Sequence, residues 1–347
     1  MNSVKQLVSK GVKQYSNEQY ADSIKSYNQA KDIVKLYDPG NVDLVDIINR
    51  NIGLSYSSLM KYDKALESYN SVKNRNNATL LYETSLALLH LGRIDEAMPL
   101  YRNRYCREMK FPLIPLPFIE ITSSPIELSG KNVLILNEEG LGDELMYMRS
   151  IYKISQIVES AMVQVYPELI KLFEENIKLP NIKFFSKRSF DRDFFDQCEV
   201  WTTTGTIWSW FPNEPALELK SGRDKLEMPE GHNIAFVHSP NIKSKNFKDR
   251  RINEQYFKNL GKQKGVVLHS MQYGTNEPYA RNYVINDFID TLQIIESVDD
   301  VQVIDTSVAH LLANSFARHS VKGMLVYKNY IDWRWTNNFY DIPILKV

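Results

Sequence analysis

The segment that decides the fold is residues 133–144, VLILNEEGLGDE, in which an aliphatic run leads into a polar turn with two glycines. The run at residues 133–136 has the length of a buried strand, and a helical pattern follows over residues 143–159. Gly140 and Gly142 permit a tight turn with close backbone approach. A strand, a glycine turn and a helix in this order are typical of a βαβ unit.

Six further apolar runs of strand length recur along the chain, at residues 163–166, 182–185, 234–237, 266–269, 301–304 and 324–327. Helical patterns lie between most of them, which predicts parallel sheets. A break at residues 226–232, LEMPEGH, divides this part of the chain in two. We therefore expect two Rossmann-like domains, residues 131–230 and 231–347, facing a cleft. Ligands of such sheets bind beyond the carboxyl ends of the strands.

The first third of the chain instead repeats a pattern of small and aromatic residues. Two small residues stand twelve positions apart in three places (11→23, 53→65 and 85→97), and an aromatic residue follows four positions later. Small residues at a helix crossing let two backbones approach. The pattern resembles tetratricopeptide repeats, which predicts a solenoid of helix pairs over residues 1–110. Residues 111–130 contain four prolines and are expected to form a linker.

Composition excludes several classes of protein. The 347 residues include 42 Lys and Arg against 42 Asp and Glu, so no net charge attracts the chain to nucleic acid or an anionic membrane. Two cysteines are too few for a disulfide framework or a zinc site built on several thiolates. No apolar run is long enough to span a bilayer, and the N-terminus lacks a signal-peptide core. We expect a cytoplasmic protein.

Three motifs follow predicted strands and could carry chemistry. In the first, Asp143 falls in the first turn of a helix, where it is either a plain helix-capping residue or a general base toward an uncharged hydroxyl. The second, residues 239–251, has five basic residues and one acidic residue in its last eleven positions. Clusters of this kind bind phosphate, although a solvated loop is the usual alternative. The candidate ligands in it are Asn241, Lys243, Lys245 and Arg251.

The third motif is residues 303–311, VIDTSVAHL, where a strand ends and a helix starts. Asp305, Thr306 and Ser307 are good capping residues, and the free N–H groups of a helix start attract anions. His310 lies one turn into this helix, on the side of Thr306 and Ser307. We predict that His310 donates a hydrogen bond to a bound phosphate.

Two further groups of residues have competing interpretations. The segment WTTTGTIWSWFP at residues 201–212 is expected to be a polar loop. Its residues Trp208 and Trp210, like Trp333 and Trp335 near the C-terminus, form either a stacking platform for a sugar or acceptor or a buried interface. The Asp191-Arg192-Asp193 triplet has the pattern of a metal-binding D-x-D, but further acidic residues beside it favour a solvated face.

Taken in order, the motifs resemble those of the heptosyltransferase-like glycosyltransferases (glycosyltransferase family 9 and relatives). The matching segments are G-L-G-D at residues 140–143, the basic loop at residues 239–252, D-T-S-V-A-H-L at residues 305–311 and D-W-R-W at residues 332–335. The resemblance implies a GT-B fold behind a tetratricopeptide solenoid. It implies transfer of a sugar from a nucleotide-sugar donor to a hydroxyl with inversion, without a metal or cofactor.

The resemblance assigns roles to the candidate residues. Asp143 becomes the general base, and Thr306, Ser307, His310 and the basic loop stabilise the leaving diphosphate. Asp305 is expected to cap the helix or bind a sugar hydroxyl. Glu144 departs from the family pattern, which commonly has a small hydroxyl residue at this position. A second carboxylate there could repel phosphate, or raise the pKa of Asp143 if both are buried together.

Three interpretations of function stay open. The first is a glycosyltransferase whose repeats recruit or orient a protein, glycan or other hydroxyl acceptor. The second is a tetratricopeptide adaptor with a catalytically degenerate transferase domain, which Glu144 and the short C-terminus favour. The third is a sugar transferase that modifies nucleic acid. Self-association into a homo-oligomer is compatible with all three, because a solenoid can pair through an uncapped end.

Overall fold

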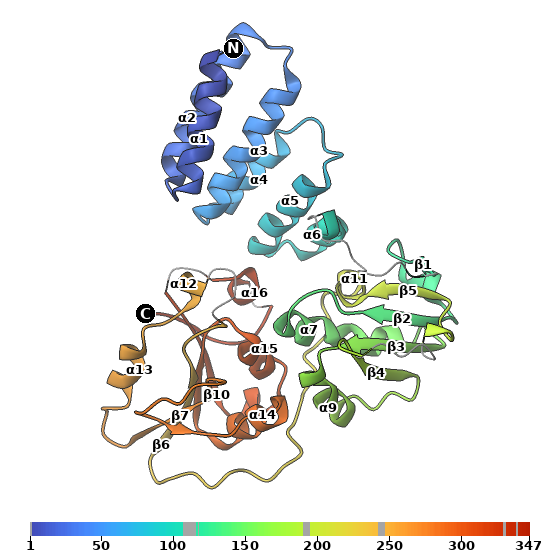
Figure 1. Ribbon diagram of the computed structural model, residues 1–347, viewed down its shortest axis with the longest axis vertical. Helices are drawn as coiled ribbons and strands as arrows, with labels where there is room; N and C mark the ends of the chain where they lie inside the picture. Colours follow the sequence, from blue (N-terminus) through green and yellow to red (C-terminus); the bar gives the residue numbers. More distant parts are fainter. Residues whose placement is uncertain are drawn as a thin grey trace. The chain divides into compact units, whose positions relative to one another are not determined.

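The computed structural model describes residues 2–106, 116, 118–189, 195–241, 247–328, 331–337 and 339–347. The chain divides into two compact units, Met1–Leu113 and Ile114–Val347, which we call unit 1 and unit 2. Figure 1 colours both along the sequence, from blue to red. Within the described ranges, no helix combines the length and apolarity needed to cross a membrane.

Unit 1 is helical, and neighbouring helices along the chain contact one another. Its elements are α1 (Asn2–Ser16), α2 (Tyr20–Tyr37), α3 (Val42–Ser58), α4 (Tyr62–Asn70), α5 (Ala78–His90), α6 (Ile94–Tyr101) and the 3-10 helix η1 (Arg102–Cys106).

The turns within the helix pairs of unit 1 are copies of one another. Each contains one residue in the left-handed region: Glu18 (φ 62°), Met60 (φ 56°) and Gly92 (φ 72°). In each turn the N–H of the following residue donates to the carbonyl five positions earlier, at 2.9 Å. A hydrogen bond of this kind ends a helix tightly. Unit 1 is therefore built from three similar helix pairs, while its assignment to the tetratricopeptide family stays a prediction.

The small and aromatic residues of the sequence pattern meet at the helix crossings. A Cβ placed on Gly11 would lie 2.5 Å from the Tyr27 ring, and one on Gly53 would lie 2.3 Å from the Tyr69 ring. Both tyrosines are buried, at 2% exposure. Each ring therefore occupies the room that a glycine leaves on the preceding helix, as the spacing predicts.

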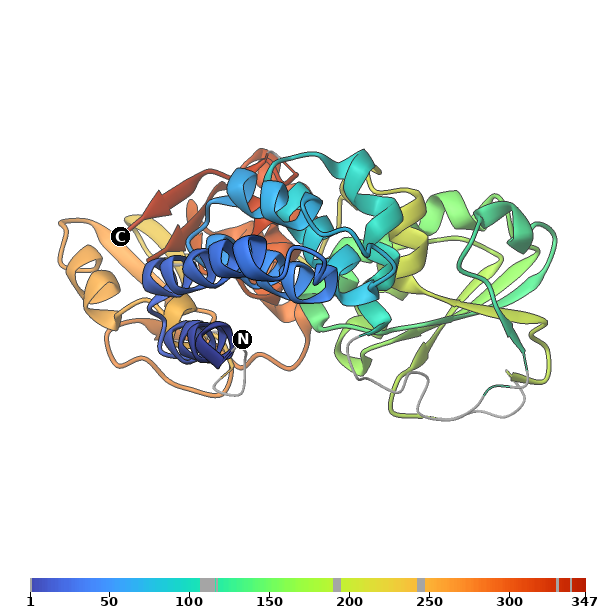
Figure 2. The ribbon, with the colours of Figure 1, turned by 90° about the horizontal axis from the view of Figure 1, so that it is seen from above.

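Unit 2 contains two parallel sheets, which appear as separate groups of strands in both views (Figures 1 and 2). The first sheet has the order β1-β5-β2-β3-β4 and the second the order β11-β10-β9-β6-β7-β8. Their strands are β1 (Ile119–Glu120), β2 (Asn132–Leu136), β3 (Ser160–Val165), β4 (Ile182–Ser186), β5 (Val200–Thr203), β6 (His232–Val237), β7 (Val266–Ser270), β8 (Arg281–Asn282), β9 (Asp300–Val303), β10 (Lys322–Tyr327) and β11 (Ile344–Lys346).

Helices connect the strands, as expected for parallel sheets. Those of the first half are η2 (Pro125–Leu128), α7 (Leu141–Tyr147), η3 (Met148–Ser150), α8 (Ile151–Ser155), α9 (Pro167–Asn176) and α11 (Thr204–Trp210). Those of the second half are α12 (Phe247–Arg250), α13 (Glu254–Leu260), α14 (Phe288–Ser297), α15 (Ser307–Ala313), η4 (Phe316–His319) and α16 (Trp333–Thr336).

Each of the seven predicted apolar runs overlaps a strand, but two predictions about the first half were wrong. The Trp-Thr-Thr-Thr segment expected to be a polar loop forms β5, which is buried along its length and lies between β1 and β2. β-Branched and aromatic residues suit a buried strand even without an aliphatic run. The helix expected over residues 143–159 is divided into α7, η3 and α8.

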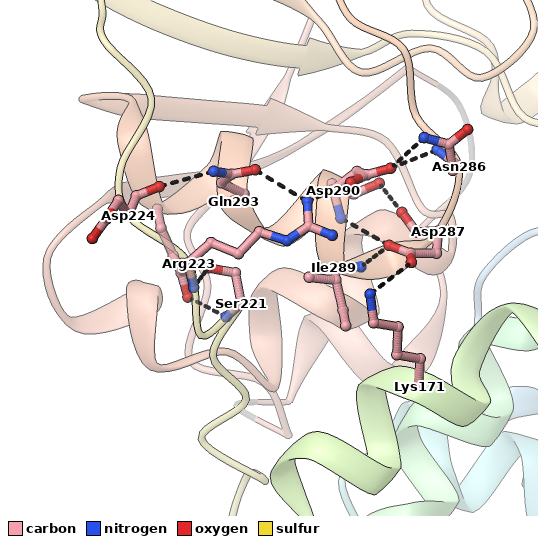
Figure 3. A network of polar contacts seen from close by, with 11 residues as sticks. Lys171, Ser221, Arg223, Asp224, Asn286, Asp287, Ile289, Asp290 and Gln293 are labelled. Atoms are coloured by element: carbon pink, nitrogen blue, oxygen red, sulfur yellow. Dashed lines mark hydrogen bonds and ion pairs between the residues drawn. The ribbon is translucent and has the colours of Figure 1, made fainter.

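The segment between the two sheets is fastened to α14 (Figure 3). Arg223 donates to the Asp290 carboxylate at 2.6 Å, and Gln293 donates to the carbonyl of Asp224 at 2.8 Å. At the start of the same helix, the Asp287 carboxylate caps two backbone N–H groups and faces Lys171 of α9 at 3.9 Å. The segment around Arg223 and Asp224, which connects the two sheets, thus belongs structurally to the second half of unit 2. Helix α9 contacts that half at the N-terminal end of α14.

Candidate active site

A cavity of about 380 Å³ opens where loops from both halves of unit 2 meet. Its lining comes from segments that follow β2, β6, β9 and β10, as expected of a ligand site beyond the carboxyl ends of parallel strands. The lining residues are Gly140, Leu141, Gly142, Asp143, Pro240, Asn241, Arg250, Asp305, Thr306, Ser307, His310, Asp332 and Arg334. We call this the central cavity. It brings together eight of the fifteen residues that the sequence singled out.

Gly142 sets how closely α7 approaches α15. A Cβ at this position would lie 2.7 Å from Cδ2 and 3.1 Å from Nε2 of His310, closer than side-chain atoms tolerate. Gly140 has a different role, because it precedes α7 with an ordinary φ of −82° and its missing Cβ would make only a normal contact. Of the two glycines, only Gly142 is therefore required for the close approach of α7 to α15.

Asp143 projects into the central cavity and forms an ion pair with Arg334 at 2.6 Å. Arg334 is held on its other side by Asp332 at 2.8 Å, and its Nε contacts the Met146 sulfur at 3.2 Å. Sequence reasoning missed Arg334 and Asp332, although both lie in the D-W-R-W segment. Their charges stand next to the tryptophans of that segment, so the motif itself contained the signal.

Asp305 does not cap α15, which contradicts the first of the two roles expected for it and leaves the second, binding of a sugar hydroxyl, a prediction. Its carboxylate accepts the indole N–H of Trp335 at 3.0 Å and lies 3.5 Å from Nε of Arg250. Thr306 occupies the capping position without a side-chain bond to the helix. Burial raises the pKa of Asp305, and the nearby Asp332 carboxylate adds to the rise. α15 is only seven residues long, so its N-terminus alone does not make an anion site.

His310 is buried against the wall of the central cavity, at 5% exposure. Its Nδ1 is 2.9 Å from the hydroxyl of Tyr340, and its Nε2 is 3.9 Å from Asp305. Burial first, and then the Arg334 charge, hold the pKa of His310 well below its usual value. The imidazole is therefore neutral and can donate one hydrogen bond. Tyr340 carries no motif that would have pointed to it in the sequence.

The basic loop contributes a different arginine from the one predicted. Arg250 lines the central cavity, whereas Arg251 is exposed and its guanidinium lies 5.9 Å from the Phe247 ring. Asn241 lines the cavity as expected. Lys243 and Lys245 lie outside the described residues.

Glu144 points away from the central cavity, which corrects its interpretation as a threat to phosphate binding. Its side chain is fully buried and accepts the backbone N–H of Tyr166 at 3.2 Å, at the end of β3. Burial raises the pKa of Glu144 from 4.5 to about 8. The carboxyl group therefore fastens α7 to the first sheet and is no argument against activity.

The tryptophans are mainly part of the protein interior. Trp208, Trp333 and Trp335 are at most 3% exposed, and Trp208 packs against Trp333 with ring centroids 5.8 Å apart. Three of the four expected platform residues therefore cannot stack on a ligand in this structure. Trp210 is half-buried and lies outside the central cavity.

A second cavity of about 390 Å³ shares Leu141, Pro240, Asn241, Thr306 and Ser307 with the central cavity. We call it the side cavity. Much of its remaining wall is apolar and comes from Val237, Met271, Ile285, Phe288 and Val308. The two cavities together offer a charged compartment beside an apolar one.

The described residues contain no group of three or more histidine, cysteine, aspartate or glutamate side chains arranged to hold a metal ion. Asp191 and Asp193, the D-x-D candidates, lie outside those residues.

No protein-family model and no curated protein matches the chain. Among solved structures, TibC from enterotoxigenic E. coli H10407, an iron-containing dodecameric glycosyltransferase, is similar with a TM-score of 0.45 and 11% identity. That match covers 58% of this chain and 59% of TibC. TibC in complex with ADP-D-beta-D-heptose gives a TM-score of 0.49 and 11% identity, over 69% of this chain and 66% of that one.

E. coli heptosyltransferase WaaC with ADP is similar with a TM-score of 0.42 and 10% identity, over 62% of this chain and 93% of that chain. The chain thus spans less than two thirds of the length of TibC.

Proposed function

We propose that unit 2 is a glycosyltransferase that moves a sugar from a nucleotide-sugar donor to a hydroxyl group, with inversion and without a metal ion. The observation that carries this proposal is the composition of the central cavity. A carboxylate from the first half, Asp143, lines the same cavity as Arg250, Arg334 and His310 from the second half. The central cavity thus combines a candidate general base with hydrogen-bond donors that can stabilise negative charge.

The chemistry of transfer fits these groups. The acceptor hydroxyl loses a proton as its oxygen attacks the anomeric carbon, and Asp143 is the carboxylate positioned to take that proton. The bond to the donor phosphate breaks on the opposite side, which inverts the anomeric centre. Negative charge then grows on the leaving diphosphate, where Arg250 and the N–H of His310 can stabilise it. In this proposal, Arg250 and the His310 N–H take the place of a divalent cation.

The side cavity provides a place for the nucleoside. Thr306 and Ser307 line both cavities, so a diphosphate bound beside them would connect a sugar in the central cavity to a nucleoside in the side cavity. The apolar wall of the side cavity suits the flat face of a base.

Unit 1 is proposed to recruit or orient the acceptor, which we expect to be a protein, a glycan or another hydroxyl-bearing molecule. Stacked helix pairs commonly present such a surface.

The donor site is tested by calorimetric binding of UDP, GDP, ADP and CDP with EDTA present. We expect one of them to bind, and Arg250→Gln to weaken its binding at least tenfold, because a charged hydrogen bond to phosphate is lost. Arg251→Gln is the matched control, since this neighbouring arginine lies outside the cavity, and we expect it to change the affinity less than threefold. Equal effects of the two substitutions would contradict this placement of the diphosphate.

A nucleotide-binding adaptor without turnover is the second candidate. The specific observation in its favour is the 2.6 Å ion pair between Asp143 and Arg334, which engages the proposed base. Binding occurs under both proposals, and only turnover separates them.

A further inference from the structure

A buried hydroxyl stands directly behind His310. Tyr340 is 4% exposed, follows α16 in the chain, and places its oxygen 2.9 Å from Nδ1 of the imidazole. The Trp335 ring packs on both residues, with centroids 5.1 Å from His310 and 4.8 Å from Tyr340. The imidazole is therefore enclosed on the side away from the cavity by two aromatic rings and one hydroxyl.

The direction of the bond between Tyr340 and His310 follows from the neighbours of the hydroxyl. Burial raises the pKa of Tyr340, so the phenol keeps its hydrogen. Within the described part of the chain, no acceptor other than Nδ1 of His310 lies within hydrogen-bond distance of this hydroxyl. A buried O–H group that donates to nothing is costly. The phenol therefore directs its hydrogen toward Nδ1.

The other imidazole nitrogen must then hold the hydrogen, because a neutral imidazole has one N–H and one bare nitrogen. Nε2 lies beside Gly142 in the lining of the central cavity, and a Cβ on Gly142 would come within 3.1 Å of it. Asp305 is too far away to accept this hydrogen, at 3.9 Å, and its nearer oxygen already accepts the Trp335 indole N–H at 3.0 Å. The Nε2 hydrogen is thus available to a ligand.

We propose that Tyr340 is a positioning residue that holds His310 as the neutral tautomer with its hydrogen on Nε2, aimed at an anionic oxygen in the central cavity. The identity of that oxygen as a donor phosphate rests on the proposed function, whereas the tautomer does not. No proton is transferred in this role, since the imidazole only donates a hydrogen bond. Tyr340 acts through His310 and need not touch the substrate.

The tautomer can be measured in the intact chain with both histidine ring nitrogens labelled by ¹⁵N. Chemical shifts and two-bond couplings distinguish a bare nitrogen from an N–H, and His310→Gln assigns the His310 signals among the six histidines. At pH 7 we expect Nδ1 of His310 to be bare and Nε2 to hold the hydrogen. In Tyr340→Phe we expect a mixture of both tautomers.

The matched control is Tyr283→Phe, which removes a similar hydroxyl 2.6 Å from Nδ1 of His269 in the same half of unit 2. This substitution is expected to leave the His310 nitrogen shifts unchanged. A hydrogen on Nδ1 of His310 in the wild-type chain would overturn the proposal, and this part of the test needs no variant to fold. An unchanged tautomer in folded Tyr340→Phe would also overturn it.

Inorganic pyrophosphate serves as the probe for the anionic oxygen. We expect its dissociation constant to rise about tenfold in Tyr340→Phe, because part of the population presents a bare nitrogen to the anion. A changed tautomer with unchanged pyrophosphate affinity would support the role of Tyr340 while contradicting the phosphate site of the proposed function. The two proposals can therefore fail separately.

Discussion

At the scale of single residues, Gly142 is a position of the central cavity that leaves no room for a larger side chain. Gly142→Ala would place a methyl group 2.7 Å from the His310 ring, which must then move within a buried wall. We expect this substitution to weaken pyrophosphate binding about tenfold or more while the chain stays folded. Titration calorimetry together with circular dichroism checks both points, and an unchanged affinity would show that His310 is not needed where the structure puts it.

The raised pKa of Glu144 predicts that the stability of unit 2 depends on pH. Its pKa is raised from 4.5 to about 8 in the folded protein, so between these values the native state binds more protons than the unfolded chain. The stability of unit 2 should therefore fall as pH rises through this window, by an amount on the order of a few kcal/mol. Glu144→Gln removes the titration. We expect this variant to gain stability relative to wild type between pH 5 and pH 8.

Tryptophan fluorescence in urea measures this effect in unit 2, because all five tryptophans of the chain lie there. If the difference between Glu144→Gln and wild type is the same at pH 5 and pH 8, the buried carboxyl does not titrate as described.

At the scale of elements, two of the helix crossings of unit 1 depend on glycine. Gly53→Ala would place its Cβ 2.3 Å from the buried Tyr69 ring. Overpacking costs about 1–3 kcal/mol, more than the roughly 1 kcal/mol that alanine contributes through helix propensity. We expect a lower thermal transition of the helical signal in circular dichroism, with the tryptophan transition of unit 2 unchanged.

Gly40→Ala is the control for this experiment, because nothing lies within 4 Å of the added Cβ. Equal effects of the two substitutions would refute the explanation from packing.

Most elements could be predicted from local sequence, and the exceptions have physical causes. Runs of aliphatic residues predicted β2, β6 and β9, because a strand buried on both faces needs them. Strand β5 escaped prediction because its buried positions hold tryptophan and threonine, which carry polar atoms, in place of an aliphatic run. Asp305 was assigned to a helix cap because the local pattern fits one. Its actual partner, Trp335, is 30 residues away, and no local rule connects the two.

At the scale of the whole molecule, the site depends on contacts between distant parts of unit 2. Asp143 and Arg334 are 191 residues apart in sequence and 2.6 Å apart in space. The sequence motifs located the loops of the central cavity, since loops at strand ends share an edge. They could not show which charged side chains pair, because pairing depends on the packing of the two halves.

The segment that connects the two sheets, which contains Arg223, should contribute measurably to the stability of unit 2. Arg223→Met leaves the Asp290 carboxylate, which is 14% exposed, without its 2.6 Å partner, and we expect a loss of about 1–2 kcal/mol. Lys171→Met removes a longer and more exposed ion pair, at 3.9 Å, and should cost less than about 1 kcal/mol. Urea unfolding followed by tryptophan fluorescence checks the order, and a larger loss in Lys171→Met would reverse this ranking.

The measurement that tests the central claim most directly is hydrolysis of UDP-, GDP-, ADP- and CDP-sugars by the intact chain with EDTA present. Wild type is compared with Asp143→Asn and His310→Ala. The proposed mechanism predicts slow release of one nucleoside diphosphate that persists in EDTA. It predicts a loss of at least tenfold in His310→Ala, which lacks the donor to the leaving group. Absence of hydrolysis for every donor, together with no thermal stabilisation by any nucleotide, would contradict the transferase and leave unit 1 as the functional part of the chain.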